Sequence, residues 1–249
     1  MTKMLASITS VAEAQLALDL GADIIDLKNP SEGALGALPL ATIRDIVDFI
    51  DRRRLISATI GDVPETLDEV VEKINSTAAT GVDIVKIGIA TSRSPLTSWQ
   101  GLACEPHSIR LVAVLFAEDR FDLEWIDGLA ELGFYGVMLD TADKSMGGLR
   151  DHYNDKFLTK FLRCASACDL VCGLAGSLNL DDIAPLLALA PDYLGFRGAL
   201  CSDSKRTKQL SAERFRAVRA SIPAETQFAA INAVIATTPL QLARDQIRK

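Results

Sequence analysis

Histidine and cysteine are scarce in this sequence, which limits its redox and metal chemistry. The 249 residues include two histidines, His107 and His152, and five cysteines. An odd number of cysteines indicates reduced thiols rather than a disulfide framework. Cys164, Cys168 and Cys172 are spaced by four, but Cys172 falls in an apolar run that reads as a strand, and no zinc-ligand spacing emerges. We therefore expect no metal ion and no Cys–His nucleophile pair.

Long apolar runs, an excess of positive charge and nucleotide-binding loops are also missing. No run reaches the ~18–20 residues of a membrane span, and the amino-terminal segment lacks a full signal peptide, so the cytoplasm is expected. A formal net charge of −7 argues against nucleic acid, which is bound by clustered Lys and Arg. An anionic small molecule stays compatible, because the local field matters more than the total charge. Without a Gly-x-Gly-x-x-Gly or Walker-type loop, we expect no cofactor.

What the sequence does contain is a regular alternation of short apolar runs with amphipathic segments. The candidate strands are residues 4–8, 23–28, 55–60, 84–88, 110–116, 136–140, 170–175 and 193–197. Residues 11–20, 67–79, 124–132 and 182–189 have the three-to-four residue spacing of half-buried helices. Gly21, Gly81 and Gly133 suit the left-handed position where a helix ends before the next strand. Eight strand–helix units predict an α/β fold, a single (β/α)8 TIM barrel spanning residues 1–249.

Residues 222–249 read as an extension beyond the eighth helix. The run 227–235 within it is apolar enough to pack, and we expect it at the interface of a homo-oligomer.

Three lysines fall at or just past the predicted carboxyl ends of strands: Lys28, Lys86 and Lys144. Since alternate residues of a strand share a face, Asp26 shares a face with Lys28. We expect the charged faces to point into the barrel, because the opposite faces are purely apolar and suit helix packing. Barrel active sites lie at this end of the strands. Several lysines in one mouth would lower one another's pKa, and a neutral amine is the nucleophile that Schiff-base enzymes need.

Each of these groups also has a structural interpretation. Lys28 is the Schiff-base amine, an ion-pair partner of Asp26 or a solvated residue at the strand end. Lys86 either forms a structural salt bridge or does acid–base work or contacts phosphate. Asp140 and Lys144 either form a loop ion pair or shuttle protons.

Smaller polar groups predict where a substrate would bind. Ser57 and Thr59 point inward in the predicted third strand, where they either bind substrate hydroxyls or merely precede a turn.

Two glycine-rich turns follow the seventh and eighth strands and carry Gly176, Ser177, Arg197 and Gly198. Loops seven and eight of this fold frequently bind phosphate, because glycine lets backbone N–H groups approach an anion. Ordinary strand-to-helix turns are the alternative. The run 205–208 is either solvated or the rim of the phosphate side.

Six segments together resemble the (5-formylfuran-3-yl)methyl phosphate synthase family of methanofuran biosynthesis. They are residues 21–36, 57–64, 85–88, 139–144, 174–178 and 195–201. The resemblance implies a TIM barrel that condenses two molecules of glyceraldehyde 3-phosphate into 4-(hydroxymethyl)-2-furancarboxaldehyde phosphate, with loss of phosphate and water. By motif, Lys28 would be the Schiff-base lysine, Lys86 the proton acceptor, and Asp140 with Lys144 the assistants of proton transfer and elimination. Residues 91–106, the region of Arg120 and residues 222–249 depart from the family pattern.

Other functions share parts of this pattern. A class I aldolase of the deoxyribose-phosphate type would use the same lysine without forming a ring. A sugar-phosphate isomerase or epimerase would use acid–base catalysis alone, and a non-catalytic barrel would only bind a phosphorylated ligand. The fold alone does not choose among them.

Overall fold

The computed structural model describes residues 1–62, 66–91, 95–104, 109–119 and 121–223. Eight parallel strands form a closed barrel in chain order, with β8 paired to β1. The strands are β1 (Lys3–Ile8), β2 (Ile24–Leu27), β3 (Leu55–Thr59), β4 (Ile84–Ile89), β5 (Arg110–Phe116), β6 (Gly136–Asp140), β7 (Val171–Leu174) and β8 (Tyr193–Phe196). Each lies within one residue of its predicted bounds, so the TIM-barrel prediction is confirmed.

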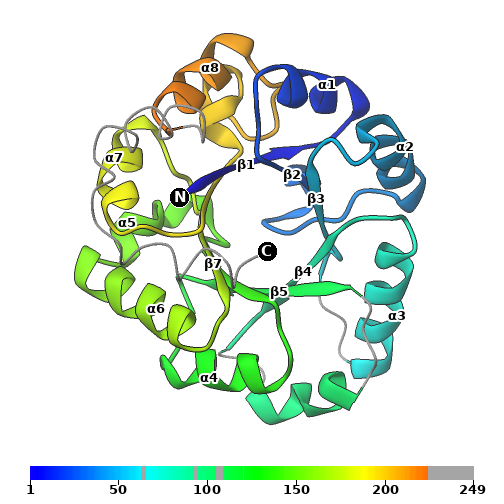
Figure 1. The fold of residues 1–249 in the computed structure, drawn as a ribbon, viewed down its shortest axis with the longest axis vertical. Helices are drawn as coiled ribbons and strands as arrows, with labels where there is room; N and C mark the ends of the chain where they lie inside the picture. Colours follow the sequence, from blue (N-terminus) through cyan, green and yellow to red (C-terminus); the bar gives the residue numbers. More distant parts are fainter. Residues whose placement is uncertain (63–65, 92–94, 105–108, 120, 224–249) are drawn as a thin grey trace, which may run out of the picture.

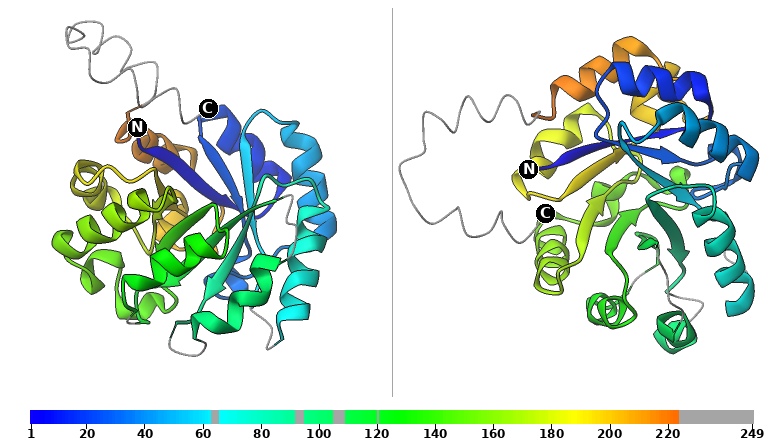
Figure 2. Two further views of the ribbon diagram at one scale, coloured as in Figure 1. Left: turned by 60° about the horizontal axis from the view of Figure 1, so that its bottom comes forward. Right: turned by 45° about the vertical axis from the view of Figure 1, so that its right-hand side comes forward.

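The helices form a ring outside the strands (Figure 1, Figure 2). They are α1 (Val11–Asp19), α2 (Leu40–Ile50), α3 (Leu67–Ala78), α4 (Glu124–Glu131), α5 (Leu149–His152), α6 (Asp155–Ala167), α7 (Leu180–Ala188) and α8 (Ala212–Ala220). Short 3-10 helices occupy several loops: η1 (Pro30–Glu32), η2 (Leu96–Cys104), η3 (Lys144–Met146), η4 (Gly198–Leu200) and η5 (Ser202–Ser204). The sequence periodicity located α1, α3, α4 and α7, whereas α2, α5, α6 and α8 were not assigned.

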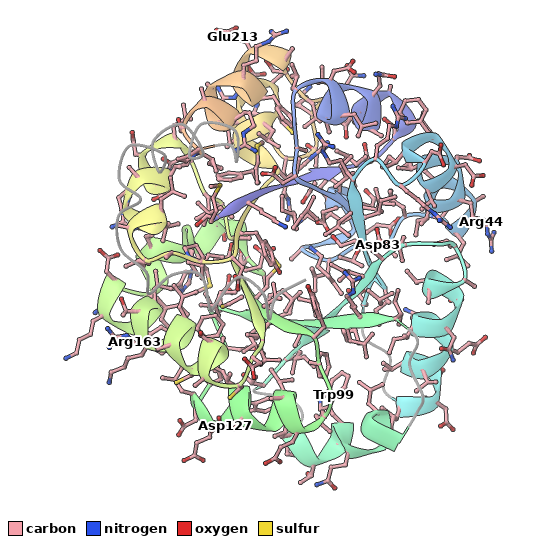
Figure 3. The ribbon with its side chains drawn as sticks, viewed as in Figure 1. Arg44, Asp83, Trp99, Asp127, Arg163 and Glu213 are labelled. Carbon is pink, nitrogen blue, oxygen red and sulfur yellow. The ribbon has the colours of Figure 1, made fainter. Side chains whose placement is uncertain are left out.

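A repeated Gly-x-Asp pattern joins helices to strands. Gly21 and Gly81 have φ of +82° and +92°, a conformation that glycine adopts without steric cost. Two residues later, Asp23 Oδ2 accepts the Met4 N–H at 2.7 Å, and Asp83 Oδ2 accepts the Ile56 N–H at 2.8 Å. Asp83 is labelled in Figure 3. Each aspartate therefore caps the start of the preceding strand, so the pattern fixes both the helix end and the entry to the barrel.

Apolar side chains form two separate clusters. The larger lies between the strands and the helices and includes Leu27, Val85 and Leu139, the residues expected on the outer face. The smaller cluster consists of Leu35, from the loop after η1, and of inward-facing side chains in or next to the strands: Leu5, Ile24, Ile84, Val112, Val114, Met138, Ala175 and Tyr193. Side chains fill the ring of strands, so the barrel is a packed core rather than a pore (Figure 3). The predicted face assignment is confirmed.

The structure describes only the start of the predicted carboxyl-terminal extension. Ile222 is buried and Pro223 is half-buried, whereas residues 224–249, including the run 227–235, lie outside the described residues. Cys172 is buried in β7, as its apolar run predicted. No helix in the described part of the chain is long and apolar enough to cross a membrane.

Candidate active site

A cavity of about 740 Å³ lies at the carboxyl ends of the strands. Eight of the residues proposed from the sequence line it: Asp26, Lys28, Lys86, Asp140, Gly176, Ser177, Arg197 and Gly198. These residues come from β2, β4 and β6 and from the loops after β2, β7 and β8, so the fold gathers positions that are far apart in the chain. Ser57 and Thr59 do not line the cavity, and the side chain of Lys144 lies outside the described residues.

Lys86 and Asp26 form a buried ion pair at the base of the cavity. Lys86 Nζ lies 2.6 Å from Asp26 Oδ1, and the two side chains are 2% and 0% exposed. Asp26 also accepts hydrogen bonds from the hydroxyls of Ser57, at 2.7 Å, and Ser7, at 2.8 Å. The β2–β3 register places Asp26 beside Ser57, and the β3–β4 register places Thr59 beside Lys86. Strand pairing therefore places the Ser57 hydroxyl next to the Asp26 carboxylate.

Burial and charge act in opposite directions on this pair. Burial would raise the pKa of Asp26, but the positive charges of Lys86 and Lys28, together with hydrogen bonds from Lys86 and Ser57, lower the pKa below 3.8. Burial lowers the pKa of Lys86 below 10.5, the carboxylate of Asp26 opposes that shift, and the charge of Lys28 adds to it. Asp26 is thus held as a carboxylate, and Lys86 is easier to deprotonate than an exposed lysine.

Lys28 pairs with a different carboxylate. Its Nζ lies 3.6 Å from Asp140 Oδ2, and its side chain is 12% exposed. Asp140 Oδ1 accepts the N–H of Thr141 at 2.7 Å. The ion pair between Lys28 and Asp26, considered from the sequence, is not the one formed, because Asp26 lies within 2.6 Å of Lys86. Lys28 is therefore more accessible than Lys86, and it has the carboxylate of Asp140 beside it.

Lys144 begins η3, four residues past the last residue of β6. Asp143 caps this short helix by accepting the N–H of Ser145 at 2.8 Å. The proposed Asp140–Lys144 pair stays a prediction.

Ser57 and Thr59 serve the protein's own hydrogen bonding in this structure. Ser57 donates to Asp26, and Thr59 Oγ1 donates to the Gly36 carbonyl at 3.0 Å. Both side chains are buried. Thr59 thereby ties β3 to the loop that follows Lys28.

The loops after β7 and β8 line the cavity with Gly176, Ser177, Gly198 and Ala199. Gly176 has φ of +104°, and a Cβ there would lie 2.9 Å from Thr141 Cγ2, so the position requires glycine. None of the hydrogen bonds among the described residues uses the amide N–H of Gly176, Ser177, Gly198 or Ala199. We refer to these four amides as the amide cradle. Backbone N–H groups without a protein acceptor, on loops that line a cavity, are available to an anion such as a phosphate group.

A family model described as 4-HFC-P synthase matches residues 4–219 of the chain, from β1 into α8. The chain belongs to the 4-HFC-P synthase family. The family suggested by the six sequence segments is confirmed, and the chain is an enzyme of that family.

Relatives in this family come from bacteria and archaea. A Methylorubrum extorquens relative is 42% identical over 212 residues, which cover 85% of this chain and 88% of the relative. A (5-formylfuran-3-yl)methyl phosphate synthase of Methanococcus maripaludis strain C5 is 33% identical over 217 residues, 82% of this chain and 92% of the relative. The enzyme of that name from Methanopyrus kandleri is 32% identical over 220 residues, 83% and 92% of the two chains.

Solved structures of other enzymes share the fold of this 4-HFC-P synthase family member. Phosphoribosyl anthranilate isomerase from Thermus thermophilus has a TM-score of 0.63 at 17% identity, covering 89% of this chain and 98% of the isomerase. A 3-hexulose-6-phosphate synthase has a TM-score of 0.57 at 19% identity, covering 89% and 100% of the two chains. At these identities the likeness shows the fold alone.

The cavity of this 4-HFC-P synthase family member is also lined by Ser7 and Arg214, which are not predicted from the sequence. Ser7, at the end of β1, had no signal beyond its place in an apolar run. Arg214, on α8, lines the cavity together with Lys205 and Arg206. The run 205–208 is predicted to be solvated or the rim of the phosphate side; Lys205 and Arg206 line the cavity, and the contact with phosphate stays a prediction. Arg214 had no signal, because it lies well past the loop in sequence.

Proposed function

We propose that this enzyme condenses two molecules of glyceraldehyde 3-phosphate through a Schiff base on Lys28. The product would be 4-(hydroxymethyl)-2-furancarboxaldehyde phosphate, the furan unit used in methanofuran-type cofactor biosynthesis, with loss of phosphate and water. One observation carries the proposal: two lysines, each beside a carboxylate, share a single cavity with the amide cradle. Such a cavity combines an amine nucleophile, proton-transfer groups and an anion site.

Accessibility supports Lys28 as the nucleophile. Its side chain is 12% exposed and stands at the cavity wall, whereas Lys86 is 2% exposed and is held by Asp26 at 2.6 Å. An aldehyde entering the cavity therefore meets Lys28 first. Asp140, 3.6 Å from Lys28, is placed to accept the proton that the ammonium group loses before attack.

The proposed steps assign one task to each pair. The Lys28 amine adds to the aldehyde carbon and water leaves, which gives an iminium ion. Lys86, whose pKa burial lowers, removes the proton from the adjacent carbon, and the electron pair moves into the iminium to form an enamine. The enamine carbon forms a bond with the aldehyde of the second triose phosphate. Departure of one phosphate, ring closure and loss of two water molecules then give the aromatic furan, and hydrolysis of the iminium, which takes back the water lost in its formation, releases the product from Lys28.

Borohydride trapping tests the covalent step. The purified enzyme is reduced in the presence of glyceraldehyde 3-phosphate, and the modified peptide is located by mass spectrometry. We expect the adduct on Lys28, none in Lys28→Arg, whose guanidinium stays protonated, and a normal yield in the exposed control Lys160→Arg. An active enzyme without an adduct on Lys28 would refute the Schiff base. Furan absorbance with phosphate release distinguishes this reaction from an aldolase, which forms an adduct but no furan.

A further inference from the structure

Arg197, which the sequence singled out for phosphate, has its side chain fully engaged within the protein. An arginine has five N–H donors. Nε donates to the Arg206 carbonyl at 2.8 Å, and Nη2 donates to the Lys208 carbonyl at 2.9 Å and to Glu13 Oε1 at 3.2 Å. Nη1 donates to Glu13 Oε2 at 2.6 Å and to the Ser7 carbonyl at 3.1 Å. All five donors have protein acceptors, so none is left for a ligand.

Glu13 completes this arrangement from the first turn of α1. Besides Arg197, its carboxylate accepts the Thr9 N–H at 2.8 Å, the Thr9 hydroxyl at 3.0 Å and the Leu210 N–H at 3.2 Å. The Glu13–Arg197 pair is buried. It joins the loop after β1, the end of β8 and both ends of the 205–210 segment. The pair therefore holds the loop that carries Gly198 and Ala199. Because the charges of Arg197 and Glu13 cancel, the pair contributes no net positive charge to the cavity.

Arg214 presents the opposite case. Its Nε donates to the Ala199 carbonyl at 3.1 Å, and its Nη2 donates to Ser204 Oγ at 2.5 Å. Two of its five donors are thus used, and among the described residues it forms no ion pair with a carboxylate. The side chain is half-buried and lines the cavity. The bond to Ala199 places this unpaired guanidinium next to the amide cradle.

We propose that Arg214 is the charged ligand of the substrate phosphate at the amide cradle, and that Arg197 is a positioning residue that acts through Glu13 and the loop. The inference rests on the proposed function in taking a phosphorylated aldehyde as the ligand. Guanidinium groups bind phosphate through paired, charge-assisted hydrogen bonds. The three uncommitted donors of Arg214 and the four amides of the cradle supply such bonds, whereas Arg197 supplies none.

Phosphate selectivity is the readout that separates these two roles. Borohydride trapping on Lys28 is measured with glyceraldehyde 3-phosphate and with unphosphorylated glyceraldehyde. The selectivity is the glyceraldehyde concentration that gives half-maximal trapping divided by the corresponding glyceraldehyde 3-phosphate concentration. Arg214→Met should reduce this ratio by about 10- to 100-fold, the range expected for hydrogen bonds to a charged group. Arg214→Lys should retain part of it, and Arg216→Met, an exposed control on the same helix, should retain all of it.

Arg197 variants should behave differently. Arg197→Met leaves Glu13 buried without its partner, so it should lower the melting temperature, and the double variant Glu13→Met with Arg197→Met should recover most of that loss. In the folded double variant we expect the loop that carries Gly198 and Ala199 to lose order. Binding of both aldehydes should then weaken alike, so the selectivity ratio should be retained. If Arg214→Met changes the ratio less than twofold, or if the stable double variant loses selectivity as completely as Arg214→Met should, the assignment is overturned.

A direct binding measurement keeps the inference independent of turnover. Inorganic phosphate is titrated into the intact enzyme by calorimetry, and Arg214→Met should weaken its binding by the same factor. If wild-type enzyme forms no adduct on Lys28 but phosphate still binds through Arg214, the proposed function fails while the anion site stands. Equal phosphate affinity in wild type and Arg214→Met refutes the site whatever the reaction is.

Discussion

Replacing Lys86 by methionine tests the buried ion pair at the base of the cavity. Lys86 Nζ lies 2.6 Å from Asp26 Oδ1, with both side chains removed from solvent. Methionine keeps most of the length of the lysine stem but removes the charge, so among the described residues Asp26 keeps the Ser7 and Ser57 hydroxyls alone as direct donors. Breaking one side of a buried pair costs about 3–5 kcal/mol, because the remaining charge is uncompensated. We expect the free energy of unfolding at neutral pH to fall by about that amount.

The loss should depend on pH with a sign that the structure fixes. In wild type the pKa of Asp26 is lowered below 3.8, so its contribution is complete above pH 3.8 and disappears as the pH falls through the folded-state value. Without Lys86, burial dominates and raises the pKa of Asp26 in the folded state. The folded variant then binds a proton more readily than the unfolded chain does. The variant should therefore regain stability as the pH falls through this raised pKa, whereas wild type does not.

Urea unfolding at several pH values between 4 and 8 measures both effects. The double variant Asp26→Asn with Lys86→Met should recover most of the stability lost at neutral pH, because no charge is left buried. Lys160→Met, an exposed lysine on α6, should stay within about 0.5 kcal/mol of wild type. A loss below about 1 kcal/mol for Lys86→Met, or a loss that does not change with pH, would show that burial does not set the cost of the unpaired Asp26 carboxylate.

Two further predictions concern packing and thiol chemistry. Gly173→Ala should lower the free energy of unfolding by about 1–3 kcal/mol, since its Cβ would lie 2.1 Å from Tyr193 Cζ; an unchanged urea midpoint would contradict the tight packing of the inner cluster. A hydrogen bond from Cys168 Sγ to Asp127 Oδ1, with burial and the carboxylate charge, raises the pKa of Cys168 from 9.0 to about 11; Asp127 is labelled in Figure 3. Asp127→Asn should therefore speed alkylation of Cys168 at pH 8 roughly tenfold, because more thiolate outweighs its lower nucleophilicity, with Cys164 in the same sample as control; an unchanged rate would refute the hydrogen bond's effect.

The strands could be predicted from the sequence because their apolar runs are short and end at turn signals. The Gly-x-Asp junctions after α1 and α3 were visible as a pattern, although their capping of the preceding strand was not. Helix α2, which is not assigned from the sequence, also has a helical pattern in its sequence: Ile43, Ile46 and Ile50 follow helical spacing and are all buried. The pattern is harder to recognise because this segment follows the long loop after Lys28 instead of a strand end.

Within the candidate site, strand alternation was enough to place Lys28, Lys86 and Asp140 at one cavity. It was not enough to pair them. Which carboxylate meets which lysine depends on the relative height of neighbouring strands, and the register sets Asp26 level with Ser57 and Lys86 level with Thr59. The Ser57 hydroxyl, which the sequence suggests as a substrate ligand, therefore donates to the buried carboxylate of Asp26 instead.

The distribution of paired and unpaired charge then indicates where a phosphate can be held. Lys28, Lys86 and Arg197 each lie beside a carboxylate, from Asp140, Asp26 and Glu13 respectively. These three cations therefore bring little net positive charge to the cavity. Among the described residues that line it, Lys205, Arg206 and Arg214 form no such pair. A dianion gains most where positive charge is uncompensated, and of these three cations Arg214 is the one that donates to the cradle's loop, at the Ala199 carbonyl. The amide cradle and Arg214 should therefore bind the phosphate, while the paired lysines are left to exchange protons.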